Sequence, residues 1–350
     1  AYIGDQPGST LLLPYFEVET RTRSGANTVF SVNNASAVAV LTHITIWSDL
    51  AVPVLAFNVY LTGYDVQTID LKEVLNGRLP KTASDGQDPA DTANPNDGIS
   101  NQGELSQDIN FASCNGQFPF PDQLSDDYIA HMKASLTGKA SAFYSGKCSG
   151  LNRGDSIARG YVTIDTVTNC TLRFPGDAGY FINGGGGDAS NQNYLWGQYY
   201  YLPKTRSSNG EALVPIRTSS TEDETSVPGN YTFYGRYAAW TAADNRQPLP
   251  TSFISRYSKR SKSVATSLIV WRDPKVNQNP FTCGSLPTWY PLGQEGITIF
   301  DQEENPVVME TSPVSPQPPN TGLIPFGAAT QRVLVGSTKL PVPFTSGQLY

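Results

Sequence analysis

Acidic and amide side chains crowd the stretch between residues 85 and 97. This stretch contains Asp85, Asp88, Asp91, Asn94, Asn96 and Asp97. A hard cation such as Ca²⁺ is held by several oxygens of this kind at once. The spacing departs from the calcium loop of EF-hand proteins, because Asn96 and Asp97 are adjacent. We therefore expect an unliganded polar loop and no cofactor, with weak calcium binding as the alternative.

Residues that could act as catalytic acids, bases or nucleophiles are sparse. The sequence has two histidines, His43 and His131, and neither accompanies a serine in a G-x-S-x-G context. Asp301, Glu303 and Glu304 could supply the paired carboxylates of a glycosidase, but they lie together in a polar segment typical of a turn. We expect both histidines to be structural and the protein not to be an enzyme.

Aromatic residues in the segment LWGQYYYL, residues 195–202, could bind sugars by stacking. Trp196, Tyr199 and Tyr201 are the candidate residues for a polysaccharide ligand. Side chains alternate between the two faces of a strand, so Tyr199 and Tyr201 share one face and Tyr200 lies on the other. The same alternation suits a strand buried on both faces, and packing in the core is the alternative interpretation.

The four cysteines, Cys114, Cys148, Cys170 and Cys283, lack the short paired spacing of a zinc site. An even number in a chain rich in Tyr, Asn, Gly and Ser indicates disulfides and an oxidising compartment. We predict the pairs Cys114–Cys148 and Cys170–Cys283, because the first pair brackets one insertion. Buried free thiols are the alternative.

Short strands separated by turn residues dominate the sequence. In the first part of the chain, β-branched and aromatic residues are concentrated in segments 11–18, 28–32, 38–47, 54–61 and 66–71. Residues 76–113 have few large apolar side chains, which predicts a long surface loop. One helix is expected between Ser125 and Gly138.

A twelve-residue pattern occurs twice. ITIWSDLAVPVL at 44–55 and ITIFDQEENPVV at 297–308 share Ile-Thr-Ile, an aromatic residue, a polar turn of equal length and Pro-Val. The repeat predicts an all-β fold. This fold has two β-sandwich (Ig-like) lobes, residues 1–170 and 171–350, or one large sandwich. In both cases it carries a long loop and one short helical insertion within residues 76–150.

Charge and hydropathy exclude several classes of partner. The formal net charge is −7 and 16% of the residues are charged, so no basic field for nucleic acid is expected. No run approaches the roughly 20 apolar residues that a membrane helix needs. The sequence starts at Ala1 without a charged and then apolar leader. From this we expect that an export signal has been removed and that the protein is secreted, extracellular or at the cell surface.

Five segments spread over most of the chain carry a family resemblance. They are TLLLPYFEVET, TVFSVNNASAVAV, LTGYDVQTIDLKEV, GNYTFYGRY and WYPLGQEGITIFDQEENPV. They resemble a group of secreted bacterial β-rich proteins of uncharacterised function. The resemblance implies an exported bacterial protein and offers no functional residues to transfer.

The N-terminal strand is the predicted site of self-association. Pro14 cannot donate a hydrogen bond to a neighbouring strand, so this strand belongs at a sheet edge. An edge strand can add to the sheet of a second subunit. Pairing within its own lobe is the alternative. The predicted assembly strand comprises Leu11, Leu12, Leu13, Tyr15 and Phe16.

These observations favour a non-enzymatic extracellular structural protein. We expect it to form a homo-oligomer or polymer, such as a filament or a surface layer. A glycan-binding or adhesive β-sandwich module that uses the aromatic strands is the alternative. A hydrolase whose carboxylates do not form a recognisable pair is the least supported class.

Overall fold

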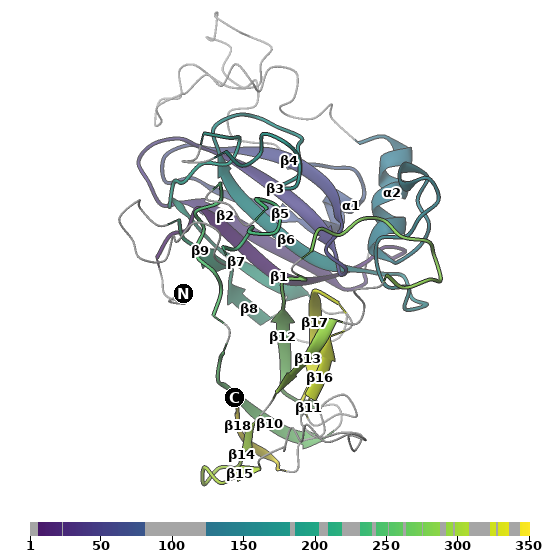
Figure 1. Cartoon of the computed structure of the whole chain (residues 1–350), viewed down its shortest axis with the longest axis vertical. Helices are drawn as coiled ribbons and strands as arrows, with labels where there is room; N and C mark the ends of the chain where they lie inside the picture. The colour runs from purple at the N-terminus through teal and green to yellow at the C-terminus, as the bar shows by residue number, and fades with distance from the viewer. Residues whose placement is uncertain are drawn as a thin grey trace, which may run out of the picture. The chain divides into compact units, whose positions relative to one another are not determined.

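The computed structural model describes most of the chain (Figure 1). The acidic loop from Asp85 to Asp97, the candidate calcium site, lies outside the described residues, and so does Cys114. The described residues are 6–22, 24–80, 124–182, 186–202, 209–218, 232–239, 243–250, 252–261, 264–274, 276–287, 292–296, 298–307, 323–326, 328–335 and 344–350.

The chain divides into two compact units, and antiparallel β-sheets dominate both, which confirms the all-β fold class. Unit 1 comprises Ala1–Leu249 and Lys275–Ser285. Unit 2 comprises Pro250–Pro274 and Leu286–Tyr350.

The border expected at residue 170 does not coincide with this division. Strands β7 (Leu195–Leu202) and β9 (Val214–Ile216) follow that residue in sequence. They nevertheless pair with β2 (Asn27–Asn34) and β1 (Thr10–Glu19), respectively. The N-terminal sheets therefore need strands from both sides of the expected border.

Unit 1 contains two main sheets. The first has the strand order β4-β3-β6-β1-β9 (Figure 1). Besides β1 and β9 it contains β3 (Val40–Ser48), β4 (Pro53–Leu61) and β6 (Ile157–Val167). The second has the order β5-β2-β7-β8, with β5 (Val66–Asp70) and β8 (Asn209–Ala212) at its edges. Every residue of β3 is buried, so the first sheet is covered on both faces.

One hydrophobic cluster joins the two sheets. Inward side chains alternate with outward ones along each strand. The inward set includes Leu13 and Ile44 from the first sheet and Phe30 and Tyr199 from the second. Burial of such a side chain contributes roughly 1.5–3 kcal/mol. Because a slip of one residue would turn the whole apolar set outward, this cluster fixes the register of both sheets.

The helix predicted after Ser125 is confirmed. It is α2 (Asp126–Leu136), and the Ser125 hydroxyl caps its first turn by accepting a hydrogen bond from the N–H of Tyr128. A shorter helix, α1 (Leu71–Leu75), begins at the Asp70 cap directly after β5. Side chains that accept hydrogen bonds at these positions satisfy backbone donors that have no partner within the helix.

Aromatic hydroxyl groups cover the edge of the first sheet at β4. Tyr128 of α2 donates a hydrogen bond to the carbonyl oxygen of Val54 at 3.2 Å. Tyr144 of the 3-10 helix η2 (Ala142–Tyr144) donates to the carbonyl oxygen of Pro53 at 2.6 Å. An uncovered edge strand pairs readily with other chains, so this insertion protects unit 1 from such pairing.

The strand predicted to mediate assembly is buried within unit 1, so that prediction is wrong. β1 pairs with β6 on one side and, through Thr10–Leu12, with β9 on the other. Farther along, Tyr201 donates a hydrogen bond to the carbonyl oxygen of Tyr15, and the Thr28 hydroxyl bonds to both backbone groups of Glu17. These side chains replace a missing strand neighbour. The strand residues are at most 4% exposed; they are Leu11, Leu12, Leu13, Tyr15 and Phe16.

A disulfide joins Cys148 and Cys283. Both predicted pairs, Cys114–Cys148 and Cys170–Cys283, are therefore wrong. Backbone hydrogen bonds between Cys148 and Phe281 hold together two segments that are far apart in sequence. Contact in the fold, and not the bracketing of an insertion, decides the pairing. Cys170 is also disulfide-bonded, as predicted.

Unit 2 consists of short strands. Its largest sheet has the order β11-β10-β18-β14-β15, while β12 pairs with β17 and β13 pairs with β16. The strands are β10 (Ser255–Ser261), β11 (Val264–Ala265), β12 (Ser267–Trp271), β13 (Leu292–Gly296), β14 (Ile299–Phe300), β15 (Pro306–Val307), β16 (Leu323–Phe326), β17 (Thr330–Leu334) and β18 (Ser346–Leu349).

The two copies of the twelve-residue pattern form equivalent hairpins. Trp47 pairs with Pro53 across the hairpin of β3 and β4. Phe300 pairs with Pro306 across the hairpin of β14 and β15. The aromatic residue and the proline of the repeat therefore occupy the same register in both units.

The backbone geometry repeats as well. Ala51 and Glu304, the fourth residue after the aromatic residue in each copy, have φ angles of 60° and 64°, a conformation that is uncommon for residues with a Cβ. A Cβ at Gly160 on β6, or at Gly347 on β18, would lie 1.9 Å from the carbonyl oxygen of the aromatic residue in its hairpin. These shared features indicate that the repeat is structural and not a coincidence of strand composition.

The similarity extends to the order of the strands. In unit 1 the strands before and after the hairpin, β2 and β5, pair with one another. In unit 2 two strand pairs enclose the hairpin: β13 pairs with β16, and farther out in sequence β12 pairs with β17. Each hairpin is continued on its first strand by two further strands, β6 and β1 in unit 1 and β18 and β10 in unit 2. The two units thus share the order of strands in the hairpin sheet, and unit 2 has one more enclosing strand pair than unit 1.

Removing the Cys148–Cys283 disulfide should destabilise unit 1. The bond closes a sequence separation of 135 residues, so the double substitution Cys148→Ser and Cys283→Ser should lower the free energy of unfolding by about 2–5 kcal/mol. Urea denaturation measures this difference, and mass spectrometry of a non-reduced digest should recover the two cysteines in linked peptides. A double variant as stable as the wild type would contradict the expectation.

Candidate functional site

The outward face of the first sheet is polar yet buried. Along β3 and β6 the residues that alternate with the core set point away from the hydrophobic cluster. Those at the centre of the sheet are at most 1% exposed, because other segments of unit 1 cover this face. They include His43, Thr45, Trp47, Tyr161, Thr163 and Asp165.

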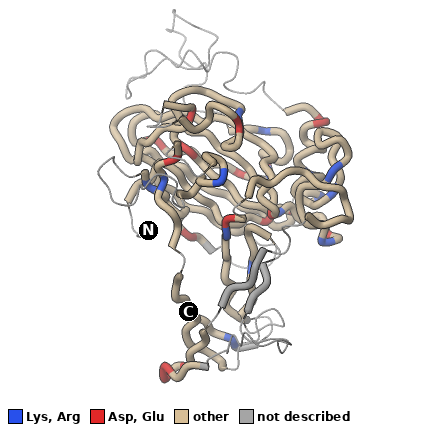
Figure 2. The backbone as a smooth tube through the Cα atoms, in the orientation of Figure 1, with Lys and Arg blue, Asp and Glu red and all other residues tan. Residues whose placement is uncertain are grey.

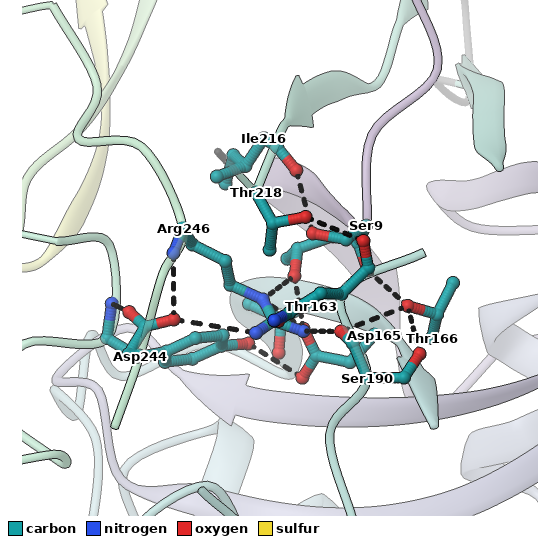
Figure 3. A network of polar contacts seen from close by, with 12 residues as sticks. Ser9, Thr163, Asp165, Thr166, Ser190, Ile216, Thr218, Asp244 and Arg246 are labelled. Atoms are coloured by element: carbon teal, nitrogen blue, oxygen red, sulfur yellow. Dashed lines mark hydrogen bonds and ion pairs between the residues drawn. The ribbon is translucent and has the colours of Figure 1, made fainter. Parts of the chain in front are cut away.

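Asp165 on β6 is the centre of the polar network on this face (Figure 3). Tyr180 donates a hydrogen bond to one carboxylate oxygen at 2.6 Å, and Tyr234 donates to the same oxygen at 3.0 Å. The hydroxyl of Thr10 on β1 donates to the other oxygen. One carboxylate therefore ties two covering segments and a neighbouring strand to the middle of the sheet.

Arg246 supplies the opposite charge and is 1% exposed. Its Nε lies 3.6 Å from Asp165 Oδ1, and its Nη1 lies 3.4 Å from Asp244 Oδ1. Its Nη2 donates to the carbonyl oxygen of Ser190 at 3.2 Å, and its Nε donates to Thr10 Oγ1. A buried charge is tolerated only when it is paired and hydrogen-bonded, and this guanidinium meets both conditions.

Burial and charge together set the pKa values in this network. Burial raises the pKa of Tyr180 and of Tyr234 well above the usual value, and the adjacent Asp165 carboxylate raises them further. Burial also raises the pKa of Asp244. Burial alone would lower the pKa of Arg246, but Asp165 and Asp244 outweigh it, so the pKa rises. Both tyrosines therefore stay protonated hydrogen-bond donors.

A second cluster on the same face is built from aromatic rings. Trp47 stacks on Tyr161 with the ring planes 4° apart, and its indole N–H donates to Thr163 at 2.9 Å. The guanidinium of Arg236 lies 4.3 Å from the centre of the Tyr237 ring, which also contacts Trp47. Cation–π contacts between desolvated groups stabilise such packing.

Both histidines are buried, and burial lowers the pKa of each. His43 Nδ1 lies 3.2 Å from Asn58 Oδ1 on the adjacent strand. His131 Nδ1 lies 2.6 Å from the hydroxyl of Ser141, which resembles the base and nucleophile of a hydrolase. However, His131 is 5% exposed and Ser141 is 3% exposed. A substrate cannot reach the pair, so its geometry serves packing against β4.

The same limit applies to the carboxylates of the network. Asp165 and Asp244 are 0% and 1% exposed, respectively. Neither carboxylate is accessible to a substrate in this conformation. We call the network of Asp165, Asp244 and Arg246 with Tyr180 and Tyr234 the internal clamp, because it holds the covering segments on the sheet. The predicted glycosidase candidates Asp301, Glu303 and Glu304 lie in the β14–β15 turn, where Asp301 accepts hydrogen bonds from the backbone of the same turn.

The candidate sugar-binding residues do not share one surface. Trp196 is 46% exposed, whereas Tyr199 is 5% exposed and packs in the core. Tyr201 packs against that core and donates a hydrogen bond to β1. The prediction that these three residues form one sugar-binding site is therefore wrong, because Trp196 lies on the same face of β7 as Tyr200 and on the opposite face from Tyr199 and Tyr201. Tyr200 is 41% exposed and shares the outer face with Trp196.

Sequence reasoning missed the clamp. Asp165 interrupts an otherwise apolar and hydroxyl-bearing strand, IARGYVTIDTV, and a carboxylate in such a strand signals a buried ion pair. Arg246 and Asp244 lie in a polar segment, ADNRQ, with no strand or helix pattern. No local signal in that segment predicts burial.

Comparisons with protein-family models, with curated proteins and with solved structures found no match to this chain. The resemblance to secreted bacterial proteins stays a prediction. In the described ranges, no group of three or more His, Cys, Asp or Glu side chains is placed to hold a metal ion. None of the described helices is long and apolar enough to cross a membrane. Lys and Arg residues are dispersed among Asp and Glu over the described backbone (Figure 2).

Replacing Arg246 by Met should destabilise unit 1 strongly. The substitution leaves Asp165 and Asp244 buried without their cation, which costs about 3–5 kcal/mol. The exposed pair of Arg78 and Glu73, with side chains 58% and 45% exposed, provides the control. Arg78→Met should cost less than about 1 kcal/mol. Equal costs for the two substitutions in urea denaturation would contradict the clamp.

Stability should fall as the pH drops from 7.5 to 5. The pKa of His43 is lowered by burial in the folded state, so below about pH 6.5 the unfolded chain binds a proton that the folded chain does not. The resulting slope is at most about 1.4 kcal/mol per pH unit for one histidine. His43→Gln should reduce the slope measured by urea denaturation across this range. An unchanged slope of the unfolding free energy against pH would contradict the assignment to His43 and would show that other titratable groups cause the pH dependence.

Proposed function

We propose that this protein is a non-enzymatic extracellular structural protein that self-associates into an oligomer or polymer. The observation that carries the proposal is strand β12 of unit 2, which, like β2 of unit 1, precedes the hairpin and pairs with a strand that follows it. β2 has β5 on one side and β7 on the other. Within the described residues, β12 forms a two-stranded sheet with β17 alone. A strand from a second copy would complete unit 2 as β7 completes unit 1.

Ile269, in the middle of β12, presents backbone hydrogen-bonding groups on the side opposite β17. Just beyond the two ends of β12, the N–H of Arg272 donates to the carbonyl oxygen of Ala329 at 2.6 Å, and the N–H of Val335 donates to the carbonyl oxygen of Thr266 at 2.9 Å. Both are hydrogen-bonded pairs of the ladder between β12 and β17. Hydrogen-bonded and non-hydrogen-bonded residue pairs alternate in an antiparallel ladder. The N–H and C=O of Ile269 therefore point away from β17. Groups in this position are the template on which a further strand adds.

The side chains of β12 favour burial by an added strand. Its sequence, SLIVW, carries no charge, and all five residues are half-buried. Leu268 and Val270 already pack against the core of unit 2. A new neighbour would remove more apolar surface from water, at roughly 25 cal/mol for each Å². The buried part of that core comprises Tyr257, Ile299, Val333, Val335 and Leu349.

Two further observations support the extracellular and structural parts of the proposal. Disulfides persist outside the reducing cytosol, and Cys148 and Cys283 are joined by one. The charged side chains buried on the polar face of unit 1, Asp165, Asp244 and Arg246, bind one another in the internal clamp. Strand addition between a donor site and an acceptor site repeats head to tail, so a filament or surface layer is the expected form.

Proline at position 269 tests the proposal. Because the N–H of Ile269 faces away from β17, Ile269→Pro removes no hydrogen bond between β12 and β17 but blocks an added strand. We expect the wild type to form particles larger than a monomer by light scattering and negative-stain microscopy, and Ile269→Pro to remain monomeric. Ile269→Val is the matched control and should assemble like the wild type.

The stability of each variant is checked by its melting temperature before assembly is scored. A second substitution, Ile269→Lys, places a charge on the same strand and should also prevent assembly. Wild-type protein that stays monomeric at high concentration would overturn the proposal. Folded proline and lysine variants that assemble normally would exclude β12 as the contact.

A further inference from the structure

The outer face of the second sheet in unit 1 is exposed and nearly uncharged. Phe30 and Val32 on β2 point into the core, so the residues between and beside them point outward. The strand registers align these with outward residues of β5 and β7. We call this surface the outer-sheet platform; it comprises Ser31, Val66, Thr68, Trp196, Gln198 and Tyr200.

Two aromatic rings stand on the platform. Trp196 and Tyr200 are 46% and 41% exposed, and both lie on β7. Their separation of four residues corresponds to about 13 Å along a strand. The Tyr200 ring is fixed in place, because a Cβ at Gly210 would come within 2.5 Å of it and its hydroxyl donates to Gln198 at 2.9 Å.

The groups between the rings are hydroxyls and amides. Ser31, Thr68 and Gln198 form one row across the three strands, and each can donate and accept hydrogen bonds. The charged residue that shares this face in the described sheet is Asp70. Its carboxylate accepts a hydrogen bond from Asn27 and caps α1, so it is already engaged.

We propose that the outer-sheet platform binds a neutral polysaccharide. One face of a pyranose ring presents C–H groups, which pack on the face of Trp or Tyr, while its edge presents hydroxyls that pair with Ser, Thr and Gln. Two rings separated by about 13 Å on an exposed sheet face suit an extended chain of sugars better than a monosaccharide, which binds in a pocket. The absence of available charge on the platform favours a neutral polymer over an acidic one. This activity is additional to self-association and uses a different unit.

Native affinity electrophoresis in gels that contain soluble polysaccharide tests the proposal. The neutral probes are hydroxyethyl cellulose, laminarin and galactomannan, and the anionic probes are alginate and heparin. We expect at least one neutral probe to retard the wild-type protein, with retardation unchanged between 50 and 500 mM NaCl, since screening weakens only charge interactions. Trp196→Ala and Tyr200→Ala should each weaken binding at least tenfold, and the double variant should abolish it.

Phe253→Ala is the matched control, because Phe253 is 55% exposed and lies outside the platform. It should bind like the wild type, and so should the monomeric Ile269→Pro variant. Retardation by none of the neutral probes, retardation by anionic probes alone, or equal binding by Trp196→Ala and Phe253→Ala would overturn the proposal. Loss of large particles in Trp196→Ala without any polysaccharide binding would overturn it too and assign the platform to contacts between copies.

Discussion

The burial of one carboxylate, Asp165, is the constraint on which unit 1 depends. A charged group in the middle of a sheet cannot remain without partners, so the fold must bring cations and hydroxyl donors to it. Arg246, Tyr180 and Tyr234 come from segments with no strand pattern of their own, and their contacts with Asp165 hold those segments over the sheet. Without these covering segments, the polar face of β3 and β6 would be exposed to solvent.

Both units contain the same kind of hairpin, extended by two further strands, but the elements around it differ. In unit 1 the pattern is extended by β7, covered by loops and closed at β4 by hydroxyl groups of the helical insertion. In unit 2 an equivalent hairpin with shorter strands lies between the paired strands β12 and β17 in sequence, and the described core is smaller. This difference agrees with different roles for the two units, in which unit 1 provides stability and unit 2 provides the contact with other copies.

Local patterns in the sequence predicted those features that depend on local residues. The hairpin repeat is readable because the aromatic residue, the turn and the proline keep one register in both copies, and Ser125 marks the start of α2. The disulfide pairing, the burial of Leu11 to Phe16 and the covered outer face depend on segments distant in sequence. Alternation in LWGQYYYL predicted two faces but not which one meets water, since that depends on the position of β7 in the sheet.

The Cys148–Cys283 bond also has a mechanical meaning. When a chain is pulled at its ends, force follows the shortest covalent path, and that path crosses the disulfide and omits the residues between the two cysteines. The sequence separation across the bond is 135 residues, which would add roughly 450 Å of contour length if the bond were reduced. In a load-bearing assembly, oxidation would keep each subunit short and stiff, and reduction would make it extensible.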